Sequence, residues 1–143
     1  MLVQGQPLLT SKVRSRVIYM KHNFFDPQPV HNVSAFFIRQ CVHNWPDQEC
    51  IKILRAFLPA LEKCKPRTPL LINDTVLPKR SEKTRFEERG LRQLDIGMMV
   101  VLNAKQRTEK EFRRLLKDAD ERFEIVKVHS DGSMGLVEVQ LRH

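Results

Sequence analysis

A mostly apolar run ends abruptly at a histidine, and this junction constrains the fold more than any other part of the sequence. The run, Ala35–Val42, predicts a strand that is buried on both faces in a parallel sheet. His43 follows directly, and Trp45-Pro46-Asp47 then begins a predicted helix over 47–62. A strand leading straight into a helix is typical of open α/β sheets, whose ligands lie at the carboxyl ends of the strands. His43 is therefore a candidate proton acceptor, because imidazole titrates near neutral pH.

The remaining pattern predicts one α/β domain over residues 1–143, with a mostly parallel sheet and a C-terminal antiparallel hairpin. The 47–62 helix has one core-facing stripe, made of Ile51, Leu54, Leu58 and Leu61. Further strands are predicted over 17–20, 70–77, 123–128 and 135–141, the last two joined by the turn signal Ser130-Asp-Gly-Ser. A charged loop is predicted over 78–85 and a helix over 87–102. Thr108 and Glu111 form a capping box that begins another helix, with Phe112, Leu115 and Leu116 facing inward.

Charge and composition argue against several kinds of partner. The net charge is +8, but the basic residues are interleaved with acidic ones along the sequence. This pattern favours a solvated, mildly basic surface over a nucleic-acid-binding one. No apolar run approaches the roughly 20 residues of a membrane span. The N-terminus has no signal-peptide pattern, so we expect a cytoplasmic protein. The three cysteines form no CxxC pair, which disfavours a disulfide framework or a zinc site.

Four segments, in order, carry a resemblance to a known family. They are His22-Asn-Phe-Phe-Asp-Pro-Gln-Pro-Val30, Phe37-Ile-Arg-Gln-Cys-Val-His-Asn-Trp-Pro-Asp47, Leu71-Ile-Asn-Asp-Thr-Val-Leu-Pro78 and Leu102-Asn-Ala-Lys-Gln-Arg-Thr-Glu-Lys-Glu-Phe112. Together they resemble the C-terminal part of the fungal O-methyltransferases of secondary metabolism, relatives of the plant caffeate-type enzymes. The resemblance implies a Rossmann-like class I methyltransferase sheet of strand order 3-2-1-4-5-7-6. It also implies S-adenosylmethionine as methyl donor and a small hydroxylated acceptor, aromatic or polyketide-like.

The resemblance assigns proton transfer to three residues. His43 stands at the histidine of the family's HxW(P/S)D motif, the base that deprotonates the acceptor hydroxyl. Asp74 stands where the family has an acidic residue that orients this histidine; a carboxylate there fixes the tautomer and stabilises the imidazolium. Gln106 occupies a position where many relatives carry a second Glu, and its amide can hydrogen-bond without adding negative charge.

The resemblance also implies positions for the cofactor and the acceptor. Arg39 matches a Lys or Arg that contacts the cofactor. Asn23 and Phe24 fall where relatives have Asp followed by Met or Phe around the adenine, and Asn23 lacks the carboxylate that would accept from the adenine amino group. Asn103 and Met98 correspond to residues that line the acceptor pocket.

Several of these residues also have a plainer interpretation. Asp74 alone could cap a helix or turn, and Arg39 alone could belong to a surface ion pair. Four further side chains are most simply interpreted as core packing: Trp45, Met98, Met99 and Cys41.

The family's glycine-rich turn has no counterpart in this sequence. None of the five glycines, Gly5, Gly90, Gly97, Gly132 and Gly135, forms a GxGxG cluster. The first two strands and the N-terminal dimerisation domain are also expected to be absent, which would leave the 35–42 strand at an exposed edge. We therefore expect weak S-adenosylmethionine binding by the chain alone and association into a homo- or hetero-oligomer.

Three functions stay open at this point. The chain could be an O-methyltransferase completed by another chain or a longer protein. It could instead be an inactive or regulatory partner that associates through the exposed edge. The third possibility is a repurposed binding protein or a non-methylating catalyst, for example of a dehydration or pericyclic step, that uses His43.

Overall fold

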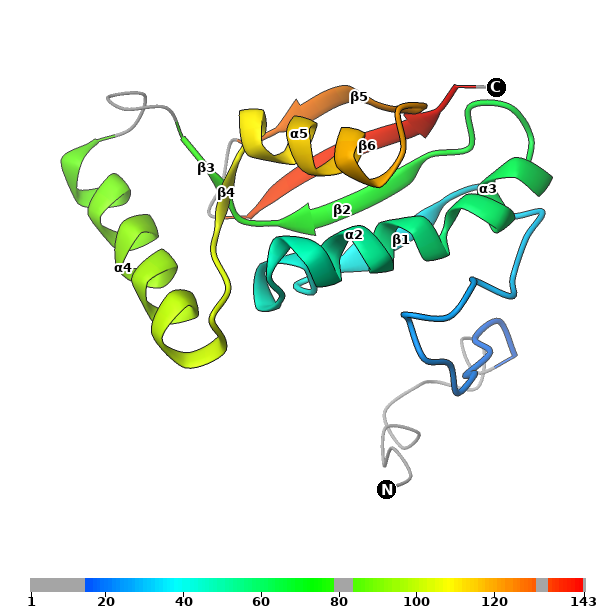
Figure 1. Cartoon of the computed structure of the whole chain (residues 1–143), viewed down its shortest axis with the longest axis horizontal. Helices are drawn as coiled ribbons and strands as arrows, with labels where there is room; N and C mark the ends of the chain where they lie inside the picture. Colours follow the sequence, from blue (N-terminus) through cyan, green and yellow to red (C-terminus); the bar gives the residue numbers. More distant parts are fainter. Residues whose placement is uncertain (1–14, 79–83, 131–133, 143) are drawn as a thin grey trace.

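The computed structural model describes residues 15–78, 84–130 and 134–142, in which helices pack against a four-stranded sheet (Figure 1). The sheet has the order β1-β2-β6-β5, formed by Phe36–Arg39, Leu70–Asp74, Gly135–Leu141 and Phe123–His129. β1 and β2 are parallel, whereas β6 is antiparallel to both of its neighbours, β2 and β5. Three of the four strands therefore run in one direction. This order corresponds to the 4-5-7-6 part of the implied methyltransferase sheet, so the predicted α/β class with a terminal antiparallel hairpin is confirmed.

Three helices lie together in front of the sheet in Figure 1: α2 (Asp47–Ala56), α3 (Leu58–Lys63) and α5 (Glu109–Ala119). α2 contacts α5, and α5 contacts β5. The core between the helices and the sheet includes Leu54, Leu61, Phe112, Leu115, Leu116, Ile72, Val137 and Val139. Full burial of such a side chain stabilises the fold by about 1.5–3 kcal/mol. The predicted capping box of α5 is confirmed, because Thr108 Oγ1 accepts from the Glu111 N–H at 3.3 Å.

Burial along β1 corrects the prediction that this strand is covered on both faces. Phe36 and Ile38 are buried, but Phe37 between them is 60% exposed. In the described sheet β1 pairs with β2 and lies at an edge. The apolar strand thus has one face buried in the core and one face largely exposed. Its composition alone does not distinguish this arrangement from burial on both faces.

Several predicted boundaries are wrong. Residues 17–20 form no strand; they are exposed, and no described strand pairs with them. The predicted 70–77 strand divides at Thr75 into β2 and β3 (Val76–Leu77), and β3 pairs in parallel with β4 (Arg107–Thr108). The 47–62 helix divides at Phe57 because Pro59 supplies no N–H to continue the hydrogen-bond ladder. The Ser130-Asp-Gly-Ser turn and most of the predicted 78–85 loop lie outside the described residues.

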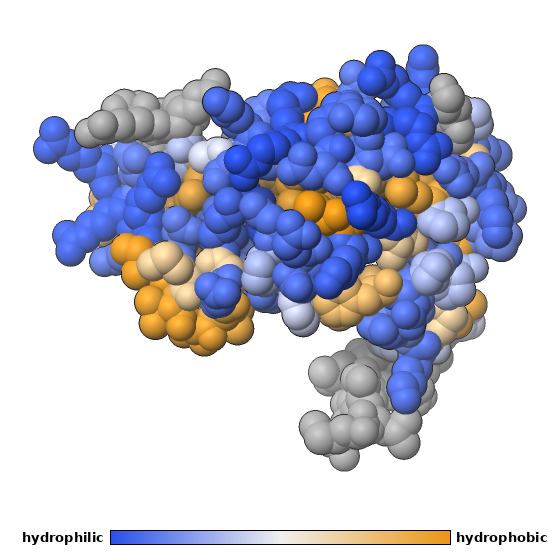
Figure 2. Space-filling model, in the orientation of Figure 1, coloured by the Kyte–Doolittle hydropathy of each residue, from blue (hydrophilic) through white to orange (hydrophobic). Residues whose placement is uncertain are grey.

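The helix α4 (Arg85–Leu102) stands apart from the sheet (Figure 1). A second capping box begins it two residues before the prediction, because Thr84 Oγ1 accepts from the Glu87 N–H and the Glu87 carboxylate accepts from the Thr84 N–H. None of its residues is buried, so the predicted core role of Met99 is wrong. Figure 2 shows hydrophobic side chains at the surface in this part of the molecule. The periodicity predicted the helix but not the openness of its apolar side.

Candidate active site

The segment that carries His43 is a sharp connection between β1 and α2. After β1, Gln40 adopts a left-handed φ of 47°, and a single 3₁₀ turn, η1 (Val42–Asn44), follows. The Gln40 N–H donates to the Asn73 carbonyl at 3.0 Å, which keeps this connection at the end of the sheet. His43 therefore lies at the carboxyl end of β1, next to the carboxyl end of β2.

Asp74, the last residue of β2, binds both the ring and the backbone of His43. His43 Nδ1 lies 3.0 Å from Asp74 Oδ1, and the His43 N–H donates to Oδ2 at 3.1 Å. The Thr75 N–H donates to Oδ1 at 3.0 Å. Asp74 is 1% exposed, and burial raises the pKa of its carboxyl, against the opposing effect of His43 and the backbone N–H groups. A carboxylate placed here keeps a proton on Nδ1 and leaves Nε2 of the ring as an acceptor.

Gln106 approaches the same imidazole from the segment before β4. Its Nε2 lies 3.3 Å from His43 Nδ1, and its own Oε1 is buried without a hydrogen-bond partner in the described part of the chain. One nitrogen cannot donate to Asp74 and also accept from Gln106. The amide rotated to place Oε1 beside the Nδ1–H therefore suits this tautomer better. The structure brings His43, Asp74 and Gln106 together from three separate segments.

The other predicted site residues are less closely gathered. Arg39 is exposed at the end of β1, and Asn23 is exposed in the N-terminal segment, where its Oδ1 accepts from the Phe25 N–H at 3.3 Å. Met98 is half-buried on α4. Asn103 ends α4 with a left-handed φ of 50° and is exposed.

An open groove of about 750 Å³ runs along the segment that carries His43. It is lined by Phe24, Gln40, Cys41, Asn44, Trp45, Pro46, Glu49 and Leu102. Its size lies within the range of about 300–1,000 Å³ that is typical of small-molecule sites. Trp45 packs edge-on against Phe25, with 5.2 Å between ring centroids, and it also lines this groove. Phe24 and Trp45 suit the flat ring of an adenine, while the described residues around the groove offer no glycine-rich turn for the rest of the cofactor.

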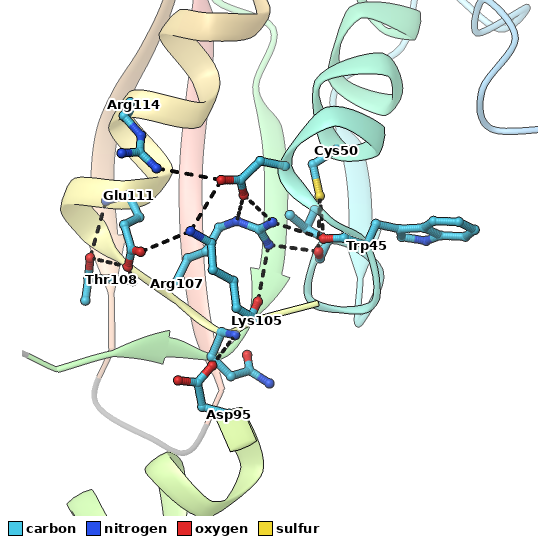
Figure 3. A network of polar contacts seen from close by, with 11 residues as sticks. Trp45, Cys50, Asp95, Lys105, Arg107, Thr108, Glu111 and Arg114 are labelled. Carbon is cyan, nitrogen blue, oxygen red and sulfur yellow. Dashed lines mark hydrogen bonds and ion pairs between the residues drawn. The ribbon is translucent and has the colours of Figure 1, made fainter. Parts of the chain in front are cut away.

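A buried arginine beside the site was not predicted from the sequence. Arg107 is 1% exposed, and its guanidinium makes a close ion pair with Asp47, with Nη2 2.7 Å from Oδ1 (Figure 3). Partial burial favours the neutral acid, but Arg107 and Lys105 together lower the pKa of Asp47. Cys50 is also buried at this point, and burial raises the pKa of its thiol to about 11. In the sequence, Arg107 looks like one more basic residue of a polar stretch, so no local signal marks its burial.

Metal and membrane features are absent from the ranges that the structure describes. No group of three or more His, Cys, Asp or Glu side chains is arranged to hold a metal ion there. No described helix combines the length and apolarity that crossing a membrane requires. Cys41, Cys50 and Cys64 are free thiols.

Comparison with known proteins decides the family. The model of the O-methyltransferase domain family matches residues 2–121. This chain belongs to the O-methyltransferase family. The family expected from the four sequence segments is thereby confirmed. The chain is 60% identical over 141 residues to O-methyltransferase sol2 of Alternaria solani, covering 99% of this chain and 33% of that relative.

Solved structures agree with this O-methyltransferase assignment. The fold is similar to that of OxaC in complex with SAH and oxaline, with 30% identity, a TM-score of 0.72, and coverage of 92% of this chain and 32% of that chain. It is also similar to a protein described as a pericyclic reaction enzyme, with 25% identity, a TM-score of 0.71, and coverage of 86% and 30% respectively. The chain thus spans about a third of the length of these relatives.

Proposed function

We propose that His43 is the general base of a methyl transfer from S-adenosylmethionine to a hydroxyl group of a small aromatic or polyketide-like secondary metabolite. The observation that carries this proposal is the His43–Asp74 pair, with Nδ1 held 3.0 Å from the carboxylate. Nε2 has no partner among the described residues and can accept the hydroxyl proton. Asp74 then stabilises the imidazolium, and the Gln106 amide lies beside the same ring nitrogen, Nδ1.

The cofactor supplies an electrophilic methyl group on a sulfonium centre. The chain's part is to raise the nucleophilicity of the acceptor oxygen and to border the ligand through the groove beside Trp45. OxaC, a structural relative, was solved with SAH and oxaline, which supports this pairing of ligands. Because the described residues offer no glycine-rich turn, the proposal includes a further segment or chain that completes the cofactor site.

Binding and turnover test this function separately. S-adenosylmethionine affinity is measured by calorimetry, and methyl transfer is measured with labelled cofactor and a panel of phenolic acceptors. We expect His43→Ala to lower turnover by about 10²–10⁴-fold, the usual contribution of a general base, while cofactor affinity stays nearly constant. His31→Ala is the matched control, because His31 is exposed and its Nδ1 contacts the Pro29 carbonyl and not a carboxylate. Full turnover by His43→Ala would remove His43 as the base.

A second candidate is a non-methylating reaction, such as a pericyclic step or a dehydration, that uses the same histidine. The similarity to the pericyclic reaction enzyme favours it. The decisive measurement is conversion of a candidate substrate with the cofactor present but unconsumed. Conversion that always consumes S-adenosylmethionine in equal amount would exclude this alternative.

Association with another chain is supported by exposed apolar surface. α4 exposes Ile96, Met99, Val100 and Val101, and β1 exposes Phe37. Contiguous exposed apolar surface commonly marks an interface. Sedimentation velocity tests the proposal: we expect a dimer or larger species, and a monomer over the whole accessible concentration range would contradict it.

A further inference from the structure

Two side chains hold the backbone carbonyls on either side of His43 and Asn44. Arg107 Nη1 donates to the Val42 carbonyl at 2.9 Å, and Nη2 donates to the Trp45 carbonyl at 3.0 Å. Cys50 Sγ lies 3.2 Å from each of the same two oxygens, so its single S–H can donate to either. Figure 3 shows Arg107 and Cys50 reaching this segment from different elements, β4 and α2. The turn that presents the imidazole is therefore held at both of its ends.

The guanidinium is itself fixed in place. Nε and Nη2 donate to Asp47 Oδ1 at 3.0 and 2.7 Å, and Nη1 also reaches the Lys105 carbonyl at 3.4 Å. All five N–H groups of Arg107 thus have acceptors. The planar group cannot rotate without breaking several of these bonds at once. The carbonyls of Val42 and Trp45 are consequently tied to a rigid group, not to a mobile side chain.

We propose that Arg107 is a positioning residue for His43, an inference that rests on the proposed role of His43 as general base. By fixing the carbonyls of Val42 and Trp45, Arg107 fixes the Cα of His43 and the direction of its N–H toward Asp74 Oδ2. The ring then has little freedom except rotation about its own side-chain bonds, and Asp74 limits that rotation. Gln106 directly precedes Arg107, so one short segment delivers both the amide beside the ring and the group that holds the turn. A lysine could not replace this arrangement, because an ammonium has three donors on a flexible stem and no planar fork.

The test follows the Nδ1–H of His43 by NMR in the ¹⁵N-labelled chain. In the native protein we expect this proton to exchange slowly with solvent. Arg107→Lys should speed its exchange about tenfold, the effect of losing a hydrogen bond to a charged group. Arg55→Lys is the matched control. Arg55 also donates to two backbone carbonyls, those of Ala119 at 2.9 Å and Asp118 at 3.1 Å, but these belong to the end of α5 and not to the turn that carries His43. This control should leave the exchange of the His43 proton unchanged.

Cys50 provides a second route if Arg107→Lys does not fold. Cys50→Ala removes a donor to the same carbonyls while the guanidinium stays, so it should speed the exchange of the His43 proton by a smaller factor. Cys50→Ser keeps a donor and should restore the native exchange rate. Native exchange in folded Arg107→Lys would overturn the proposal, as would an equal increase in Arg55→Lys. Where Arg107→Lys cannot be prepared, native exchange in Cys50→Ala would overturn it. The measurement needs no methyl donor, so a lack of transferase activity would refute the proposed function without deciding this inference.

Discussion

The Asp74 carboxylate should determine which ring nitrogen of His43 carries the proton, and Asp74→Asn should remove that control. In the native chain, Nδ1 lies 3.0 Å from Oδ1 of a carboxylate that is almost fully buried. A hydrogen bond to a charged group contributes about 1.5–3 kcal/mol. This corresponds to a preference of roughly 10- to 100-fold for the Nδ1–H tautomer.

An asparagine cannot satisfy all three donors that surround Asp74. With its oxygen at the Oδ1 position, it accepts from Nδ1–H and from Thr75, but its amide NH₂ group faces the His43 backbone N–H. With its oxygen at the Oδ2 position, the NH₂ group donates to Nδ1, and the ring proton moves to Nε2. Each orientation leaves one buried N–H unpaired, so we expect both tautomers in comparable amounts.

The stability of the variant should change little. One unpaired buried N–H costs about 1–3 kcal/mol. Burial raises the pKa of Asp74, so holding it ionised at neutral pH already destabilises the native fold, and the neutral amide removes that penalty. We therefore expect a net loss near the lower end of this range, about 1 kcal/mol.

The assay is the pair of ¹⁵N shifts of the His43 ring nitrogens, measured together with urea unfolding. Asp118→Asn is the control, because Asp118 is an exposed acid on α5. An Nε2–H tautomer in the native chain would refute the reasoning directly. So would a folded Asp74→Asn variant that keeps the native tautomer ratio.

Four further substitutions test the stability of the fold. Gly135→Ala would place a Cβ 2.6 Å from the Val76 side chain and should destabilise the chain by about 1–3 kcal/mol. Gly90→Ala would place a Cβ with nothing within 4 Å and should stabilise the chain by about 1 kcal/mol. Urea unfolding of both variants and the native chain measures the two changes. The pKa of Asp47 is lowered in the fold, so its ionised form stabilises the fold above pH of about 4. This contribution is lost as the pH falls through the folded-state pKa. Asp47→Asn should therefore weaken the dependence of the unfolding free energy on pH in the acid range, measured by urea unfolding at several pH values. Thr108→Ala should lower stability by about 1 kcal/mol in thermal melts, because it removes the cap of α5; an unchanged melting temperature would contradict this.

Local signals predicted the parts of the fold that depend on neighbours in the sequence. The strand before His43 and the Thr108–Glu111 capping box needed only adjacent residues, and both are present in the structure. The strand is shorter than the predicted 35–42, because it ends at Arg39 and Val42 already belongs to η1. The Thr84–Glu87 box carries the same signal, but the charged residues around it led to a loop prediction.

Contacts between distant residues could not be read in this way. The pairing of His43 with Asp74, 31 positions apart, was expected from the family resemblance and not from the local pattern. Nothing in the sequence separates the buried Arg107 from surface arginines, because its acceptors at Val42 and Trp45 lie more than 60 positions away. Periodicity likewise identified α4 but not the exposure of its apolar side.

The position of β6 has a consequence for how this molecule is made. Among the described strands β6 comes last in the sequence, yet it lies between β2 and β5, and its Gly135 pairs with Asp74. During synthesis, β2 and β5 leave the ribosome before the strand that joins them exists. The complete sheet, and with it the surroundings of Asp74, can therefore form only after β6 has been synthesised. A nascent chain stalled before residue 135 would expose two unpaired strand edges, the kind of state that aggregates or recruits chaperones.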